Sequence, residues 1–170
     1  MRMFVPAGLR GAFSARALSR LTMTCLYRAL GAGLAIGFME SFARLGHHDA
    51  ARVPFVTSIV LTLFGPDNAS AQPYAIFTGH LVSSVAGLAA LLCLGQGEAA
   101  AALGVAAAAA LMAVLRALHP PAGIDAFLIA YFGLPWSWIV NPVLIGAILL
   151  AGFSRLWASG GNYLSPKESR

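Results

Sequence analysis

The run from Arg116 to Asp125 holds the residues best suited to chemistry, because ionisable side chains and two prolines interrupt a strongly apolar region there. His119 directly precedes Pro120 and Pro121, and a short apolar stretch follows them. Proline suits the first turn of a helix, where free backbone amides and the helix dipole attract anions. Arg116 stands three residues before His119, so on a helix the two side chains would be neighbours. We therefore predict an anion-binding mouth at His119 and Arg116.

Each of these side chains also has a structural interpretation. Arg116 could reach the lipid headgroups, and His119 could cap a turn. Asp125 falls in the first two turns of the following short helix, where the dipole stabilises a carboxylate or where it could pair with Arg116 or His119. Because a carboxylate would compete with an incoming anion, we expect Asp125 to carry a proton during transport.

Further polar side chains lie inside the apolar stretches. His80 shares a helical stripe with Ser83, Ser84 and Gly87, which could line a pathway or let two helices pack closely. Packing does not require an imidazole, so both interpretations of His80 stay open. Asn141 and its following proline interrupt the last apolar stretch, which would free backbone carbonyls and add a side-chain amide.

Ser58 and Thr62 lie at helical spacing with Pro54 in a shorter apolar stretch. Their hydroxyls could face a pathway, or they could bond back to carbonyls of their own helix. The second interpretation is the simpler one. A loop with His47, His48 and Asp49 has poor geometry for a metal, so we expect a solvated loop there, no metal site and no cofactor.

The composition places these residues in a membrane protein. Of 170 residues, 59% are hydrophobic and only 10% are charged. Soluble domains carry about 25% charged residues, so this chain lacks the polar surface to cover itself in water. Its net charge of +5 reflects arginines before the first apolar stretch, which indicates membrane orientation rather than nucleic-acid binding. Cys25 and Cys93 lie in apolar runs and are expected to be packing thiols.

The apolar stretches predict an all-α, polytopic helix bundle. A crossing takes about 20 residues, and four stretches are that long: 21–42, 74–94, 99–118 and 136–158. Two shorter stretches, 53–64 and 122–134, begin beside proline and end in Phe-Gly, so each predicts a capped short helix. The order long, short, long occurs twice, which indicates a 3+3 inverted repeat with halves at about 21–95 and 98–158. The short helices could cross or turn back, and crossing is favoured slightly.

The charges predict an orientation with both termini in the cytoplasm of a bacterial inner membrane. Residues 1–20 carry four arginines and no acid. They are expected to form a basic interfacial segment, and an organellar transit peptide is the alternative. Residues 21–158 would then form the transmembrane domain and residues 159–170 a cytoplasmic tail.

Several of these motifs together resemble the HPP family of small integral membrane proteins. The resemblance covers roughly residues 50–165 and rests on anchors in the same order: Pro54-Phe55, Ala71-Gln72-Pro73, Gly79-His80-Leu81, His119-Pro120-Pro121-Ala122-Gly123, Asn141-Pro142-Val143, Gly146 and Asn162-Tyr163. It implies four membrane-spanning helices and a transport role, and members in chloroplasts and cyanobacteria are associated with nitrite. This chain differs where the family tends to have Gly-Ala after Pro-Phe, Arg-Asn after Gln-Pro and Ala-x-Ala after Pro-Pro-Ala-Gly: it has Val56-Thr57, Tyr74-Ala75 and Ile124-Asp125.

The leading hypothesis is a transporter or channel for a small inorganic anion, with nitrite first by resemblance. We expect a homo-oligomer, most simply a dimer, in the lipid bilayer. No motif of hydrolytic or phosphate-binding enzymes is present in the sequence, so no catalytic site is expected. The alternatives are a transporter coupled to protons or cations, and a membrane assembly or sensor protein without transport. The candidate pathway residues are His119, His80, Arg116, Pro120, Pro121, Asp125, Ser58, Thr62, Gln72 and Asn141.

Overall fold

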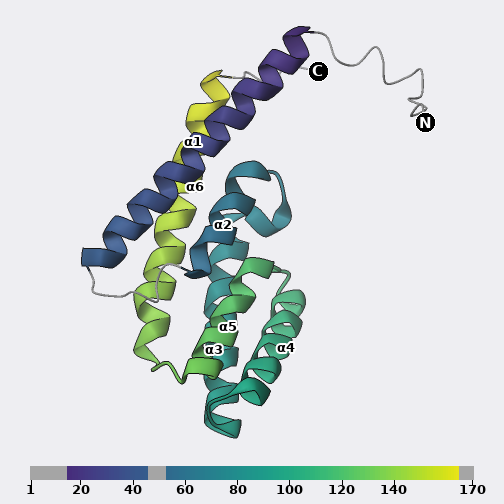
Figure 1. The fold of residues 1–170 in the computed structure, drawn as a ribbon. Coiled ribbons are helices and arrows are strands. Elements are labelled where there is room, and N and C mark those ends of the chain that lie inside the picture. Colours follow the sequence, from purple (N-terminus) through teal and green to yellow (C-terminus); the bar gives the residue numbers. More distant parts are fainter. Residues whose placement is uncertain (1–14, 46–52, 165–170) are drawn as a thin grey trace, which may run out of the picture.

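The computed structural model describes residues 15–45 and 53–164, and this part of the chain folds into helices without any strand. The all-α prediction is therefore confirmed. The elements in chain order are α1 (Ala15–Leu45), α2 (Val53–Phe64), η3 (Ala69–Ala71), α3 (Pro73–Leu94), α4 (Glu98–Val114), η4 (Pro120–Ala122), α5 (Gly123–Phe132), η5 (Ile139–Leu144) and α6 (Ile145–Leu164). Figure 1 labels the α-helices. The predictions for His47, His48 and Asp49, and for residues 1–14 and 165–170, lie outside the described residues.

Within residues 15–45 and 53–164, three helical segments are long and apolar enough to cross a bilayer: Leu21–Ser41, Pro73–Leu94 and Ile139–Gly160. The predicted span 99–118 corresponds to α4, which has 17 residues and measures about 25 Å. It ends early because the backbone leaves the helix after Leu115, and Arg116 adopts a φ of 53°. The count of four full spans therefore stays a prediction.

The predicted boundaries at both ends differ from those of the helices. α1 begins at Ala15 and so includes residues 15–20, while α6 continues to Leu164, beyond residue 158. Inside the last span, Asn141 has non-helical dihedral angles, which confirms the predicted interruption. The bond between Asn141 and Pro142 is cis.

The helices alternate in direction along the chain. α5 runs the same way as α3, because Asp125 in its first turn contacts His80 and Gly133 after its last turn lies against Gln96. The turn 95–97 joins α3 to α4, so these two are antiparallel. α5 thus begins in the interior and runs to the end of the bundle where α3 ends, as Figure 1 also shows.

The first half follows the same rule. Arg28 Nη1 of α1 donates to the carbonyl oxygen of Phe64 at the end of α2, and Tyr27 stacks on Trp157 near the end of α6. α1 is therefore antiparallel to both α2 and α6. This alternation is the one that an inverted 3+3 repeat requires, although the repeat itself stays a prediction.

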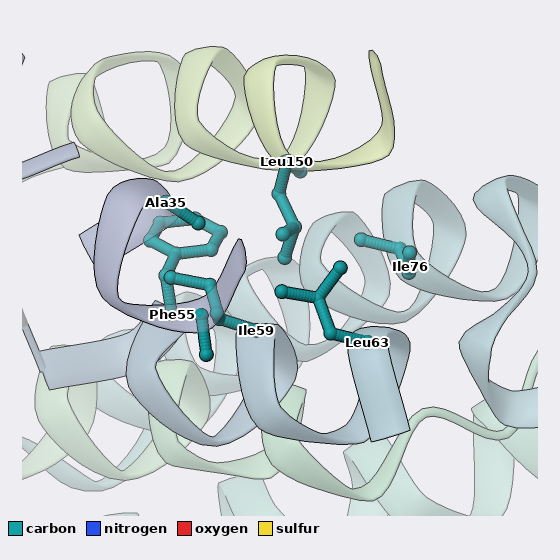
Figure 2. Close-up of a cluster of buried hydrophobic side chains, with 8 residues drawn as sticks. Ala35, Phe55, Ile59, Leu63, Ile76 and Leu150 are labelled. Carbon is teal, nitrogen blue, oxygen red and sulfur yellow. The ribbon is translucent and has the colours of Figure 1, made fainter. Parts of the chain in front are cut away.

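Two kinds of packing hold the bundle together. In the group of α3, α4 and α5, small residues let backbones approach: a Cβ added to Gly87 would lie 2.6 Å from Ala126 Cα, and one added to Gly104 would lie 3.1 Å from Gly87 Cα. In the group of α1, α2 and α6, large side chains fill the space together with Ile76 of α3. Figure 2 shows this cluster: Ala35, Phe55, Ile59, Leu63, Ile76 and Leu150.

Candidate functional site

Four polar side chains form one hydrogen-bonded chain inside the bundle, and each is 0% exposed: Ser58, His80, His119 and Asp125. We call them the buried polar network. Asp125 Oδ2 lies 2.6 Å from His80 Nδ1, and His80 Nε2 lies 3.2 Å from Ser58 Oγ. Ser58 Oγ lies 2.9 Å from His119 Nε2, and His119 Nδ1 lies 2.6 Å from the carbonyl oxygen of Ser70. The chain of contacts is unbroken from a carboxylate to a backbone carbonyl.

Each member comes from a different element. Ser58 lies in the middle of α2, His80 in α3, His119 in the connection before η4, and Asp125 in the first turn of α5. The first turns of both short helices reach His80, because the Phe55 ring of α2 also lies against it with centroids 4.8 Å apart. The first turns of the two short helices thus meet at His80.

Glycine makes the approach of His119 possible. A Cβ added to Gly79 would lie 2.7 Å from His119 Cβ, closer than side-chain carbons come in proteins. The residue before His80 must therefore lack a side chain if His119 is to reach Ser58. Next to Asp125, the Ala126 amide donates to Ser83 Oγ at 3.2 Å, so a hydroxyl from α3 caps the first turn of α5.

The partners determine where hydrogens lie. The carbonyl oxygen of Ser70 only accepts, so His119 Nδ1 carries the hydrogen of that bond. The Ser58 hydroxyl has one hydrogen, whereas ring nitrogens of both His80 and His119 face its oxygen. At least one of these two ring nitrogens must therefore donate to Ser58 Oγ.

Either choice gives the network at least one proton more than two neutral imidazoles and an ionised Asp125 would have. If His119 Nε2 donates, both nitrogens of that ring carry hydrogens and the ring is an imidazolium. If His80 Nε2 donates, the hydrogen between His80 Nδ1 and Asp125 Oδ2 makes either an imidazolium beside a carboxylate or an imidazole beside a carboxylic acid. The network therefore stores a proton at one end or the other.

The same geometry lets that proton move. The hydrogen on Asp125 passes to His80 Nδ1, the hydrogen on His80 Nε2 passes to Ser58 Oγ, and the Ser58 hydrogen passes to His119 Nε2. Asp125 becomes a carboxylate, His119 becomes an imidazolium, and His80 and Ser58 are unchanged in charge. Because every transfer follows an existing short contact, the network can act as a proton relay.

Ser58, His80 and Asp125 also have the order of a nucleophile, a base and an orienting acid. Two features separate them from a hydrolytic site. Ser58 Oγ faces a second imidazole, and the side chain is fully buried in the middle of a helix, where the backbone amides are used by the helix itself.

Two buried oxygens beside the relay have no hydrogen-bond partner among the described residues: Asp125 Oδ1 and Ser84 Oγ. Ser84 lies one helical turn beyond His80 on α3, and its side chain is 0% exposed. A buried polar atom without a partner is costly, so such atoms are places where a small polar molecule binds favourably.

Two of the other predicted residues, Arg116 and Thr62, have different surroundings. Arg116 is exposed at the end of α4, and the partner of Asp125 is His80 rather than Arg116 or His119. Thr62 is buried but its hydroxyl donates to its own helix, to the carbonyls of Ser58 and Ile59.

The remaining predicted residues lie in turns or at a break in a helix: Pro120, Pro121, Gln72 and Asn141. Pro120 is exposed and Pro121 half-buried at the start of η4, where they fix the turn after His119. Gln72 is exposed and bonds within the loop before α3. Asn141 is half-buried at the break in the last span. Within the described ranges, no cluster of three or more His, Cys, Asp or Glu side chains could hold a metal ion.

Two parts of the site had no clear sequence signal. The Ser70 carbonyl is a backbone group, which sequence patterns do not single out. Ser83 was part of the predicted stripe on α3, but its position four residues before Gly87 gave no hint that it caps another helix. The pairing of His80 with Asp125 had one indirect signal, since a buried carboxylate needs a partner.

Comparison with known proteins finds a matching family and a curated relative. The sequence model of the family described as HPP, transmembrane region, matches residues 17–163. A curated transmembrane protein of Dictyostelium discoideum is 33% identical over an alignment of 105 residues, and the alignment covers 56% of this chain. The chain covers only 36% of the length of that relative. No solved structure matches this chain.

Proposed function

This chain belongs to the HPP transmembrane family, and from that premise we propose that it transports a small solute across the membrane together with protons. The observation that carries the proposal is the unbroken chain of contacts from Asp125 through His80 and Ser58 to His119. Buried ionisable residues in a membrane are costly, and chains of Asp and His are typical of proton pathways in transporters. The family resemblance predicted from the motifs is confirmed by the match over residues 17–163.

The partnerless oxygens support a solute site beside the relay. Asp125 Oδ1 and Ser84 Oγ are available for the polar atoms of a solute, while Asp125 Oδ2 belongs to the relay. One carboxylate would thus touch both the solute and the proton. A solute bound there changes the free energy of protonating Asp125, which is the coupling that a proton-driven carrier needs.

An anion pathway is the second candidate, and nitrite remains its leading substrate. It is favoured by the first turns of α2 and α5, which both reach His80, and by the imidazolium that His119 becomes when the relay is shifted. Arg116 does not contribute to such a site, because it is exposed at the end of α4.

The test is flux through vesicles that contain the purified full chain. Nitrite, nitrate, formate and chloride are compared with and without an imposed pH gradient, and the internal pH is followed with a dye. We expect an acidic exterior to drive uptake of a preferred solute and to acidify the interior. Absence of flux for all four anions from a folded protein would contradict both transport candidates for these substrates.

Asp125→Asn separates the two candidates. The amide has the size of the carboxyl group but cannot release a proton, so gradient-driven uptake should fall by at least about tenfold. An anion pore should instead conduct at least as well, because a competing negative charge is gone. Glu98→Gln is the matched control: it also removes a carboxylate from the first turn of a helix, but this one is exposed. It should leave uptake unchanged.

We propose no enzymatic role, and the order of Ser58, His80 and Asp125 gives a direct check. A fluorophosphonate probe that labels activated serines should leave Ser58 unmodified in the folded protein. The proposed homodimer and the proposed cytoplasmic location of the termini are tested in the same preparation, by mass measurement in detergent and by protease access to sealed vesicles.

A further inference from the structure

We propose that the loop 65–72 is a gate over the His119 end of the relay and that Gln72 is the latch of this gate. The proposal rests on the proton coupling proposed above. Three observations support it. A carbonyl oxygen of the loop accepts from His119 Nδ1, the ring nitrogen that does not face Ser58; the exposed side chain of Gln72 bonds to other residues of the loop; and the loop lies at an end of the bundle.

The loop closes the relay at Ser70. His119 Nε2 faces Ser58 Oγ, and His119 Nδ1 donates to the Ser70 carbonyl oxygen at 2.6 Å. Both ring nitrogens are therefore in use. A proton that arrives at His119 can pass to water only after the contact with Ser70 opens. Ser70 itself is half-buried, whereas His119 is fully buried, so the loop separates the ring from the exterior.

Gln72 holds the loop in this closed form. Its Nε2 donates to the carbonyl oxygens of Pro66 at 2.9 Å and Asn68 at 3.3 Å. Within the loop, the Asn68 amide donates to Gly65 at 3.0 Å. These bonds fold the segment before Ser70 back on the start of α3. Gln72 is exposed and bonds to backbone carbonyls of the loop, so it acts on the relay as a positioning residue through Ser70.

The gate lies at a defined end of the bundle. The loop follows Phe64, and the carbonyl of Phe64 accepts a hydrogen bond from Arg28 in the first half of α1. The start of α1 and the end of α6 extend past this end of the bundle (Figure 1). Protons would therefore enter or leave the relay on the side of the membrane where α1 begins and α6 ends.

Gln72→Ala tests the latch. It removes two hydrogen bonds, which should raise the population of the open loop, and hence the proton leak without any solute, by about tenfold. The leak is measured as the decay of an imposed pH gradient in vesicles that contain the full chain. Gln72→Glu keeps the size of the side chain but cannot donate, so it should leak as well. Gln96→Ala is the matched control, an exposed glutamine in the turn at the opposite end, and it should not leak.

A double variant identifies the route of the leak. Because leaked protons pass through the relay, Ser58→Ala combined with Gln72→Ala should return the decay to the wild-type rate. A leak that persists in the double variant would overturn the proposal, since it would report general loosening. An unchanged decay in both Gln72 variants, with intact folding, would overturn it too.

The gate can also be tested without transport. Diethyl pyrocarbonate modifies accessible imidazoles, and mass spectrometry locates the product. His119 should be protected in the wild type and modified several-fold faster in Gln72→Ala and Gln72→Glu, with amide exchange in 65–72 also faster. If wild-type vesicles show no proton-coupled uptake but this labelling pattern holds, the proposed function fails and the gate stands. Equal labelling of His119 in the wild type and both variants overturns the gate alone.

Discussion

The group of α3, α4 and α5 and the group of α1, α2 and α6 are packed on different principles. In the first group, Gly87 leaves no room for a methyl group, because a Cβ there would lie 2.6 Å and 2.7 Å from backbone atoms of Ala126. In the second group, a Cβ added to Gly146 would instead meet the edge of the Phe55 ring. Backbones cannot give way, but a ring can turn, so the first group forms a rigid unit and the second can adjust.

The buried polar network crosses the boundary between the two groups. His80 and Asp125 belong to α3 and α5, and His119 lies in the connection between α4 and α5, whereas Ser58 belongs to α2. Ser58 is the link between the two imidazoles. A shift of α2 relative to the rigid group would therefore interrupt the relay, and the difference in packing indicates how conformation and proton movement can be coupled.

Gly87→Ala should have the largest effect if the first group is rigid. The added methyl must displace the backbone of α5, and overpacking of this kind costs about 1–3 kcal/mol. In a chain of this size the midpoint of thermal unfolding in detergent should fall by about 5–10 °C, and transport should be lost with it. An unchanged midpoint would mean that α5 moves easily along α3, and the group of α3, α4 and α5 would then not be rigid.

Ser58→Ala tests the link between the groups. It leaves two ring nitrogens without their shared partner, so we expect proton-coupled uptake to fall by about tenfold or more. The free energy of unfolding should fall by only about 1–3 kcal/mol. Thr62→Val on the same helix is the control, because the Thr62 hydroxyl bonds to carbonyls of its own helix. It should retain most of the uptake. If Ser58→Ala and Thr62→Val lose the same share of uptake, the loss comes from removing any hydroxyl of α2 and not from breaking the link between the imidazoles.

Gly146→Ala should have an intermediate effect. The methyl meets the Phe55 ring, which also lies against His80, so the ring must turn and uptake should fall a few-fold. Combining it with Phe55→Leu should restore part of the stability, since a smaller side chain makes room. If the double variant does not regain part of the midpoint of thermal unfolding, the group of α1, α2 and α6 is rigid as well.

Gly33→Ala should have the smallest effect. Its added Cβ meets nothing within 4 Å on the outer face of α1, and alanine is the better helix former by about 1 kcal/mol. Stability should rise slightly and uptake should not change. A loss of stability or a change in oligomer mass would show that this face of α1 packs against another chain.

Much of the fold and of the buried polar network could be predicted from the residues. The prolines and glycines around the two short stretches predicted α2 and α5, because capping preferences act locally. His80, His119, Asp125 and Ser58 were singled out because polar groups in a membrane need a reason to be there. Arg116 was placed in the pathway without support from the fold, since periodicity shows which helix face a residue takes but not what lies opposite. Gln72 was placed in the pathway itself, whereas its side chain bonds within the loop 65–72. The early end of α4 at Val114 also depends on the path that the chain takes to His119.

Local physics places this chain in a membrane as short and long helices, because hydrophobicity, proline and glycine act on neighbouring residues along the chain. The packing of the helices, in contrast, pairs Asp125 with His80 and lets one serine hydroxyl join two imidazoles. These contacts join residues 22 to 61 positions apart. Hydrogen bonds are directional and short, so which of the buried polar groups become partners depends on how closely the glycines let the helices approach.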